Sequence, residues 1–585
     1  MKKLCFLLVF LTLLLCSCNL AKEKTPNTTT PEVTTPAETT PEVTTPAENP
    51  HEHVFKTEVF IEPTCDKPGL KREVCECGEM IETNFDVTGE HSYGEAVIKK
   101  EPTCTEAGET VSVCSACGGV QTAPIPPTGE HSYVDAICKW CGEKDASVPF
   151  LCGDALFTYV IVYDEHASDY TVRAAEYIAA EIKARTGIVL SVMPIDASDK
   201  ENAHEIVVGE TTRPISQSLD AATEGMEFAF LATEDHIALE GDYFIIAAAA
   251  YCFVETYIPG AAFDVDIPQT VSICTPIVQK AKNFILLIGD GMGPNQTKLF
   301  DAYKNADIAD YSDGEDLFYG YLFPYIGEAK TNSLSGTTDS AAAGTALSSG
   351  YKTVNGYIGK DGDKNDVPSL TELAAGKGKA TAVMSTEAQT GATPASFSAH
   401  ANNRNDSADI LASQAKLTDS YGTVIDCNYN YDTDAQIENL RAAIARTLTS
   451  LSEDEDGFFM MYEEAYIDKH CHSNDAQNAY LTMLRFNQAI ALFMEYAFYN
   501  PDTMVIITAD HETGGLQIAD NGDFYYTTGN HTAANVPVFA YGANAEVFDG
   551  RTIENTQIPK TIAALFGVEV AGSNPLQHPA LVPVS

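Results

Sequence analysis

Three uninterrupted apolar runs stand out in the C-terminal half of the chain. They cover residues 284–288, 458–462 and 504–508, and acidic residues follow each of them closely. Unbroken apolar runs of this length predict strands that are buried on both faces, as in a parallel sheet. Ligand sites in such sheets lie beyond the carboxyl ends of the strands. We therefore expect the acidic ends of these runs to converge at one edge of a sheet, with Asp290, Glu463, Asp510 and His511.

A run of small residues at 340–349 predicts a helix that begins with a serine and ends before Gly350. A serine in the first helical turn faces unpaired backbone N–H groups and the positive end of the helix dipole, which favours an anion such as phosphate. A serine hydroxyl is a weak nucleophile unless a base or a metal activates it, and no histidine lies between residues 312 and 364. Ser340 is thus a candidate nucleophile that needs help from distant residues.

Further candidate metal ligands follow the second and third runs. Asp468 and His472 are four residues apart, so they share a face if that segment is helical, and His531 lies downstream. Carboxylates with histidines and no cysteine suit zinc with an open coordination position, whereas an oxygen-rich set with a threonine hydroxyl suits magnesium. Two zinc ions about 4 Å apart can activate an attacking oxygen and hold a leaving one.

Together these segments resemble the alkaline phosphatases. The resemblance rests on residues 288–293, 338–342, 392–395, 467–472, 508–511 and 531–532, in the order that the family has them, and it spans roughly residues 282–575. It implies an α/β catalytic domain at 282–585, with a mainly parallel sheet flanked by helices. It also implies hydrolysis of small phosphate monoesters through a phosphoserine intermediate.

Taken over position by position, the resemblance makes Ser340 the nucleophile and Arg404 the residue that grips the phosphate oxygens with its planar fork. It implies two zinc ions and one magnesium ion. One zinc would be held by Asp468, His472 and His531. The second would be held by Asp290, Asp510, His511 and the Ser340 oxygen. Magnesium would be held by Asp290, Thr393 and Glu463.

The chain departs from the family in three places. Gly391 stands where the family usually has Asp or His, two residues before the threonine, so we expect a weaker magnesium site that Gly391→Asp would tighten. The segments from Arg404 to Glu463 and from His511 to His531 are short, which leaves a homodimer open. The rival functions are a phosphodiesterase of the same superfamily and a non-catalytic surface binding protein, although the intact ligand set argues against the latter. A sulfatase would need a different motif.

The N-terminal region predicts the cellular location of the protein. Two lysines, an apolar run at residues 4–15 and the cysteines that follow predict a lipoprotein signal peptide at 1–18, with Cys18 lipidated; the alternative is an ordinary signal peptide with a spare cysteine. Residues 19–50 are rich in threonine and proline and predict an extended spacer. We therefore expect a secreted protein, lipid-anchored at the outer face of a bacterial cell membrane. The formal net charge of −48 makes nucleic-acid binding improbable.

Residues 51–145 contain cysteine-rich repeats. The sequence Glu-Pro-Thr-Cys ends at Cys65 and again at Cys104, and Cys-x-x-Cys-Gly begins at Cys114 and Cys138. This spacing is close to that of zinc ribbons, and such small units need metal or disulfides in place of a core; we favour structural zinc over disulfides. Residues 150–275, with strands expected at 159–163 and 205–209 and a helix at 171–186, predict a small α/β accessory domain.

Overall fold

The computed structural model describes residues 52–219, 223–303, 317–429, 434–519, 521–571 and 576. The signal peptide, the lipidation at Cys18 and the spacer at 19–50 are predictions that lie outside the described residues. The chain divides into two compact units, the first made of residues 1–102 and 107–126 and the second of residues 103–106 and 127–585. Among the described helices, none has the length and apolar character that crossing a membrane requires.

In the first unit, each repeat is a three-stranded antiparallel sheet. The first sheet contains β1 (Phe55–Ile61), β2 (Gly69–Cys75) and β3 (Met80–Phe85), and the second contains β4 (Val97–Lys100), β5 (Gly108–Val113) and β6 (Val120–Ile125). Both sheets have a register shift in their first hairpin, between β1 and β2 and between β4 and β5. The recurrence of this irregularity shows that the sequence repeat is also a structural repeat. In the second unit, the short hairpin β7 (Tyr133–Val134) and β8 (Ile137–Cys138) leads into the Cys-x-x-Cys-Gly sequence at Cys138, which makes it a third, shorter repeat.

The accessory region of the second unit is built on a six-stranded sheet of order β12-β11-β13-β15-β14-β17. Strands β11 (Val160–Asp164), β12 (Val192–Ile195), β13 (Glu205–Val208) and β15 (His236–Glu240) pair in parallel. Strand β14 (Phe228–Ala232) pairs antiparallel with both of its neighbours, β15 and β17 (Ser272–Cys274). The helices are α1 (Asp169–Thr186), α2 (Pro214–Ser218) and α3 (Ile246–Tyr257). A small sheet joins β9 (Phe150–Leu151), β10 (Asp154–Ala155) and β16 (Asp264–Val265). The helix expected at 171–186 is therefore α1.

An eight-stranded sheet of order β21-β20-β22-β18-β23-β28-β19-β29 carries the catalytic region. The three apolar runs are its central strands, β18 (Asn283–Gly289), β22 (Phe458–Glu464) and β23 (Thr503–Thr508), which pair in parallel. The other strands are β19 (Tyr325–Lys330), β20 (Ala380–Ser385), β21 (Val424–Cys427), β28 (Val536–Tyr541) and β29 (Thr552–Glu554). Only β28 runs antiparallel to its neighbours, β23 and β19. The mainly parallel sheet that the sequence predicts is thus confirmed.

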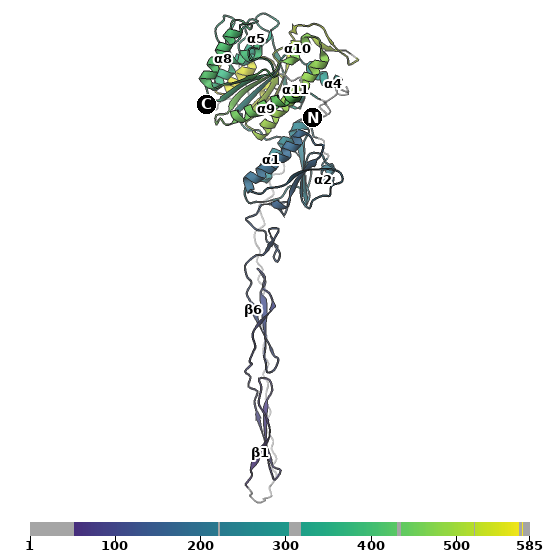
Figure 1. Cartoon of the computed structure of the whole chain (residues 1–585), viewed down its shortest axis with the longest axis vertical. Helices are drawn as coiled ribbons and strands as arrows, with labels where there is room; N and C mark the ends of the chain where they lie inside the picture. Colours follow the sequence, from purple (N-terminus) through teal and green to yellow (C-terminus); the bar gives the residue numbers. More distant parts are fainter. Residues whose placement is uncertain are drawn as a thin grey trace, which may run out of the picture. The chain divides into compact units, whose positions relative to one another are not determined.

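Helices cover both faces of this sheet, with α9 (Asp434–Ser452) and α11 (Ala476–Tyr499) on one face and α5 (Ser340–Ser349) and α8 (Ser407–Tyr421) on the other (Figure 1). The remaining helices are α4 (Leu299–Tyr303), α6 (Leu370–Ala375), α7 (Ala392–Ser398), α10 (Tyr466–His472) and α12 (Gln557–Leu565). Short strands β24 (Glu512–Thr513), β25 (Leu516–Ile518), β26 (Phe524–Tyr526) and β27 (His531–Thr532) follow β23. Helix α5 has the bounds that the sequence predicts, since Asp339 caps its start and Gly350 ends it in the left-handed conformation.

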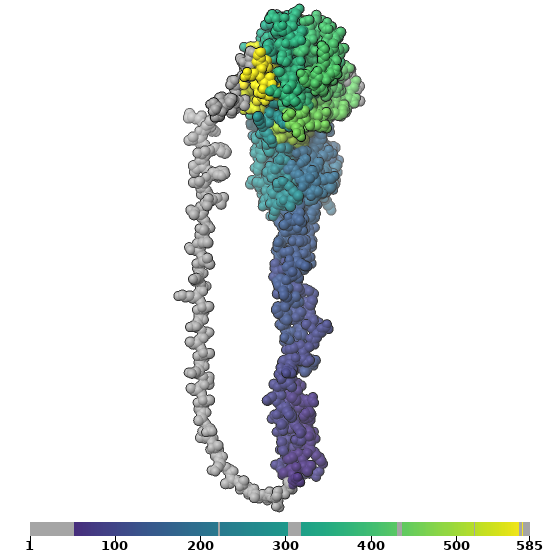
Figure 2. Space-filling model, turned by 90° about the vertical axis from the view of Figure 1, so that its left-hand side faces the viewer, coloured from purple at the N-terminus to yellow at the C-terminus, as the bar shows by residue number. Residues whose placement is uncertain are grey.

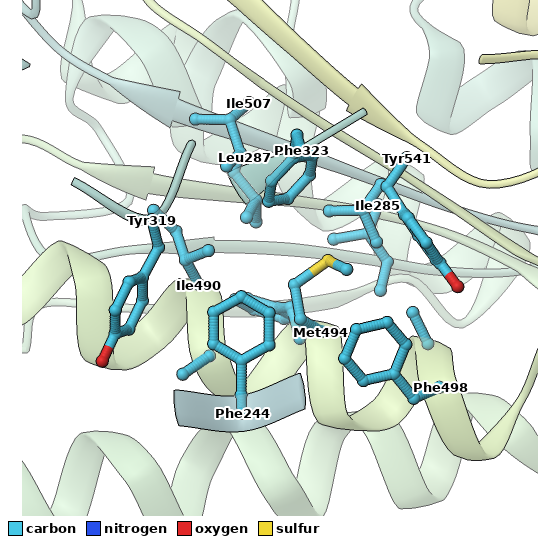
Figure 3. Packing of buried hydrophobic residues seen from close by; sticks show 14 of the residues in the cluster. Phe244, Ile285, Leu287, Tyr319, Phe323, Ile490, Met494, Phe498, Ile507 and Tyr541 are labelled. Atoms are coloured by element: carbon cyan, nitrogen blue, oxygen red, sulfur yellow. The ribbon is translucent and has the colours of Figure 1, made fainter. Parts of the chain in front are cut away.

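One hydrophobic core joins the accessory and catalytic regions (Figure 3). Phe244, from the accessory region, stacks on Phe498 of α11 with ring centroids 5.9 Å apart and meets Tyr319 edge-on at 5.0 Å. Ile285 and Ile507, on β18 and β23, close the same cluster from the sheet side. The structure therefore unites, through a continuous core, two regions that sequence patterns alone assign to separate domains.

Candidate active site

The turn after β18 brings the ends of three central strands together. The N–H of Asp290 donates to the carbonyl oxygen of Glu464, the last residue of β22, at 3.0 Å. The N–H of Gly291 donates to Oδ1 of Asp510, just beyond β23, at 3.2 Å. Gly291 has φ +74°, and a Cβ there would lie 2.8 Å from the Cα of Asp468. Only glycine permits this close approach, which confirms the expected convergence of acidic residues at one sheet edge.

The first group of polar atoms gathers around the Nε2 atom of His511. This nitrogen lies 3.2 Å from Ser340 Oγ, 3.2 Å from Asp510 Oδ2 and 3.6 Å from Asp290 Oδ1. The other ring nitrogen, Nδ1, lies 3.2 Å from the hydroxyl oxygen of Thr513. That hydroxyl donates its hydrogen bond to Asp468. The Thr513 oxygen must therefore accept the Nδ1 proton, and the Nε2 atom of His511 faces the oxygens with a bare lone pair.

This first group fits a bound cation. Asp290, Ser340, Asp510 and His511 are all buried, and Asp290 Oδ1 and Asp510 Oδ2 form no hydrogen bond within the described part of the chain. Burial and the neighbouring carboxylates raise the pKa of Asp290 and bring that of Asp510 to about 6, while burial and the nearby His531 lower the pKa of His511 to about 3. Two carboxylates, a neutral imidazole and a hydroxyl converge here, and they have too few hydrogen-bond donors to satisfy all of their lone pairs. Such a donor set suits zinc.

The second group contains Asp468 and two histidines. His472 Nδ1 donates to the carbonyl of Gly529 at 2.7 Å, and His531 Nδ1 donates to that of Thr338 at 3.0 Å, so both Nε2 atoms carry lone pairs. These two Nε2 atoms lie 3.1 Å apart and within 3.5 Å of the Asp468 carboxylate. Burial opposes ionisation of Asp468, but protons on the neighbouring histidines of the metal-free chain would lower its pKa overall. Facing lone pairs repel one another, so this arrangement also fits a cation, and its ligands are those that suit zinc.

The third group consists of oxygens alone. Thr393 lies on α7, and Glu463 lies inside β22 rather than after it, because the strand continues through Glu464. Thr393 Oγ1 and Glu463 Oε1 are buried and lack a hydrogen-bond partner among the described residues, as does Asp290 Oδ1. Burial and the charge of Glu387 raise the pKa of Glu463. A hydroxyl with two carboxylates suits magnesium, which prefers oxygen ligands.

Glu387 is a functional candidate that sequence reasoning missed. A Cβ at Gly391 would lie only 1.8 Å from Glu387 Oε1, so the Glu387 carboxylate occupies the space of the missing side chain. Its other oxygen lies 3.1 Å from Lys469 Nζ. The expectation that Gly391 leaves the magnesium site without a supporting acidic group is therefore wrong, because a carboxylate from the loop after β20 lies there. The only feature of the sequence that could have pointed to Glu387 is its position four residues before Gly391.

Arg404 lies beside the start of α5. Its Nη1 donates to Asp339 Oδ2 at 3.2 Å, and the other oxygen of Asp339 accepts from the N–H of Ala342 at 3.0 Å. The Arg404 N–H donates to Gly356 O at 2.8 Å, which fixes the backbone. One carboxylate thus caps the helix and holds the guanidinium next to Ser340. Every site residue that the sequence predicts within the described ranges lies at this sheet edge. Cys471, which precedes the candidate ligand His472, is buried against Tyr526 and is not among these ligands.

Comparison with known proteins gives consistent matches for this region. The family model "Alkaline phosphatase" matches residues 281–427 and 423–529. The chain is 27% identical to alkaline phosphatase 3 of Bacillus subtilis, over 48% of this chain and 88% of that protein. It is 24% identical to the alkaline phosphatase of Escherichia coli, over 53% of this chain and 92% of that protein. The solved alkaline phosphatase of the Antarctic bacterium TAB5 is 30% identical, over 50% of this chain and 99% of that one, with a TM-score of 0.42.

Proposed function

We propose that this phosphatase, whose residues 281–529 belong to the alkaline phosphatase family, hydrolyses phosphate monoesters through a covalent phosphoserine on Ser340. The observation that carries the proposal is the position of the Ser340 hydroxyl. It lies in the first turn of α5, 3.2 Å from the Nε2 atom of His511 and next to Asp339, the residue that holds Arg404. A nucleophile, an anion-binding helix terminus and a guanidinium therefore share one place.

Substrate binding follows from the charges at the start of α5. A phosphate monoester dianion offers three non-bridging oxygens. The guanidinium of Arg404 has five N–H groups, and its bond to Asp339 uses one of them, so its fork remains able to bind two phosphate oxygens. The N–H groups of the first helical turn and the helix dipole add positive potential at the same point. A phosphate group bound by these donors would have its phosphorus atom next to Ser340 Oγ.

The chemistry proceeds in two displacements at phosphorus. Ser340 Oγ releases its proton to solvent and forms a bond to phosphorus while the bond to the ester oxygen breaks, and the alcohol leaves with a proton taken from water. Water then attacks the phosphoserine and releases a proton, the bond between Ser340 and phosphorus breaks, Ser340 Oγ takes up a proton, and inorganic phosphate leaves. Zinc ions at the two histidine-containing groups would supply the positive charge that favours ionised hydroxyl and water. Asp290, Asp510 and His511 would hold one ion, and Asp468, His472 and His531 the other.

Magnesium is the ion that we propose for the oxygen-only group. Asp290, Thr393 and Glu463 would bind it directly, and the buried orphan oxygens of these residues support that assignment. Glu387, held by Lys469, would support the site from the space beside Gly391. Outer residues of this kind orient ligands and tune affinity.

The experiment compares the wild-type enzyme with Ser340→Ala. Phosphoprotein is sought by acid quench and peptide mass spectrometry, and kcat/KM is measured for an aryl monophosphate and the matching diester. We expect phosphate on Ser340 of the wild type only, and a large loss of monoester turnover in the variant. Ser349→Ala, at the other end of the same buried helix, is the matched control and should keep both properties. Full monoester turnover by Ser340→Ala would refute the covalent mechanism, and wild-type preference for the diester would favour a phosphodiesterase.

A further inference from the structure

The cysteine-rich repeats lack a hydrophobic core. Among the described residues up to 126, the only buried side chains of the hydrophobic class are four cysteines, Cys65, Cys75, Cys104 and Cys114. Large apolar side chains of the sheets lie in solvent instead, with Ile98 55% exposed and Val120 61% exposed. The repeat segment, purple in Figure 2, is narrow. Sheets this small need a metal or a cross-link to be stable.

In the first unit, four side chains converge across the boundary between two repeats. Cys65 and His91 come from the first repeat, and Cys114 and Cys117 come from the turn between β5 and β6 of the second. All four donor atoms lie within 4.8 Å of one another. Cys65 Sγ is 3.6 Å from Cys114 Sγ, and Cys117 Sγ is 3.3 Å from His91 Nδ1.

The same four residue types converge again in the second unit. Cys104 and His131 meet the Cys-x-x-Cys turn at Cys138 and Cys141, with donor atoms within the same limit. The separation of Cys104 and Cys138 is 3.7 Å between sulfurs, and Cys141 Sγ is 3.3 Å from His131 Nδ1. The two groups thus have matching distances. In both, a cysteine and a histidine precede the Cys-x-x-Cys pair that completes the set, so the ligands are not confined to one repeat as the zinc-ribbon comparison suggests.

A third group, with three donors in place of four, lies in the first repeat. His53 Nδ1 lies 3.3 Å from Cys77 Sγ, and Cys75 completes a set of three. No fourth donor joins this set among the described residues, and the sequence has no cysteine between residues 19 and 53. This group also has one residue fewer between its cysteines. Among the described residues, the first repeat therefore supplies three donors to this group.

The histidines are oriented for metal binding. The aromatic residue two positions after each histidine lies against its ring, with centroids 5.5 Å apart for His91 and 5.8 Å apart for His53 and His131. Each Nδ1 faces sulfur, while the outer nitrogens of His53 and His131 lie 3.0 and 3.4 Å from a glutamate. A carboxylate on the outer nitrogen fixes the tautomer that binds metal. The middle group has Gly119 in place of this glutamate.

Disulfides fit these groups less well than zinc does. Each complete group has three cysteines, so a disulfide between two of them would leave the third as a free thiol. It would also give the histidine no role in the group. Two sulfurs on a tetrahedral zinc, each about 2.3 Å from the metal, lie about 3.8 Å apart, close to the separations found here. We propose that residues 51–145 bind structural zinc in two Cys₃His sites, one within each unit, and in a weaker open site at His53, Cys75 and Cys77. These structural zinc sites take no part in the phosphatase chemistry.

The test uses the full secreted chain, purified without chelator or reductant. Zinc per chain is measured by elemental analysis for the wild type, Cys117→Ser, Cys141→Ser and the double variant. Each single variant should lose one zinc ion and the double variant two, with phosphatase activity unchanged. Cys152→Ser, which changes a cysteine outside all three groups, is the matched control and should lose none.

Cobalt substitution gives a second readout. Cobalt bound to thiolate has a charge-transfer absorption that the oxygen and nitrogen ligands of the catalytic groups cannot produce. This band should fall by about half in each single variant and to the level of the open site alone in the double variant. If a variant is not secreted, a mercurial thiol reagent applied to the wild type should release two zinc ions while activity remains. Unchanged zinc in the double variant, no release by the reagent, or disulfides between Cys65 and Cys114 and between Cys104 and Cys138 in the native protein would overturn the proposal.

Discussion

Gly391→Ala is a minimal perturbation of the proposed magnesium site. The new Cβ would lie 1.8 Å from Glu387 Oε1 and 2.2 Å from its Cδ, distances that no real contact allows. The far end of a glutamate moves at little cost, so the fold should tolerate the change. The displaced carboxylate, however, loses its 3.1 Å pairing with Lys469 and its place near Glu463.

The expected magnitude follows from the role of such outer residues. Losing a group that supports a metal ligand typically weakens metal affinity about 10- to 100-fold, or about 1.4 to 2.7 kcal/mol. We therefore expect the magnesium concentration for half-maximal activity to rise by that factor in Gly391→Ala, and Gly391→Asp to weaken the site rather than tighten it. Gly260→Ala is the matched control, because a Cβ at Gly260 meets nothing within 4 Å.

The assay titrates magnesium into chelator-dialysed, zinc-loaded enzyme and forms a double-mutant cycle with Glu387→Ala. If Gly391→Ala acts only by displacing Glu387, it should have no further effect in the Glu387→Ala background. Additive effects of the two changes would refute this reasoning, and so would an unchanged or tighter magnesium dependence in Gly391→Ala.

Three further predictions follow from the structure and the sequence. Arg404→Ala should reduce kcat/KM for an aryl monophosphate by about one to two powers of ten and reduce it less for the diester, because the diester presents fewer charged oxygens to the guanidinium; equal losses would contradict the binding role. Arg173→Ala should lower the free energy of unfolding by about 3 kcal/mol in a urea titration, because it leaves the buried Glu495 carboxylate without its partner, and the loss should shrink in a Glu495→Gln background. Cys18→Ala should move the protein from the membrane fraction to the medium, since a diacylated cysteine holds stably where a single chain does not; membrane retention of the variant would point to another anchor.

The local elements, and the chemistry that they carry, can be derived from neighbouring residues along the chain. The bounds of α5 follow from neighbours in the chain, since Asp339 caps its start and Gly350 adopts the left-handed conformation at its end. The central strands follow from unbroken apolar runs, because only a strand covered on both faces buries every side chain of such a run. The parallel order of these strands then places Asp290, Asp510 and His511 at one edge, so the first group of ligands could be anticipated.

Other features depend on segments that meet only after folding. Glu387 fills the space beside Gly391 through the path of a loop, which no spacing in the sequence encodes. The accessory region contributes Phe244 to the catalytic core, although apolar periodicity alone indicates a separate domain. Cys65 belongs with Cys114, forty-nine residues away, because adjacent sheets bring their turns together while the repeat pattern shows only identical units. Local patterns fix which side chains an element presents, but the partners of those side chains are set by long-range packing, which no local pattern encodes.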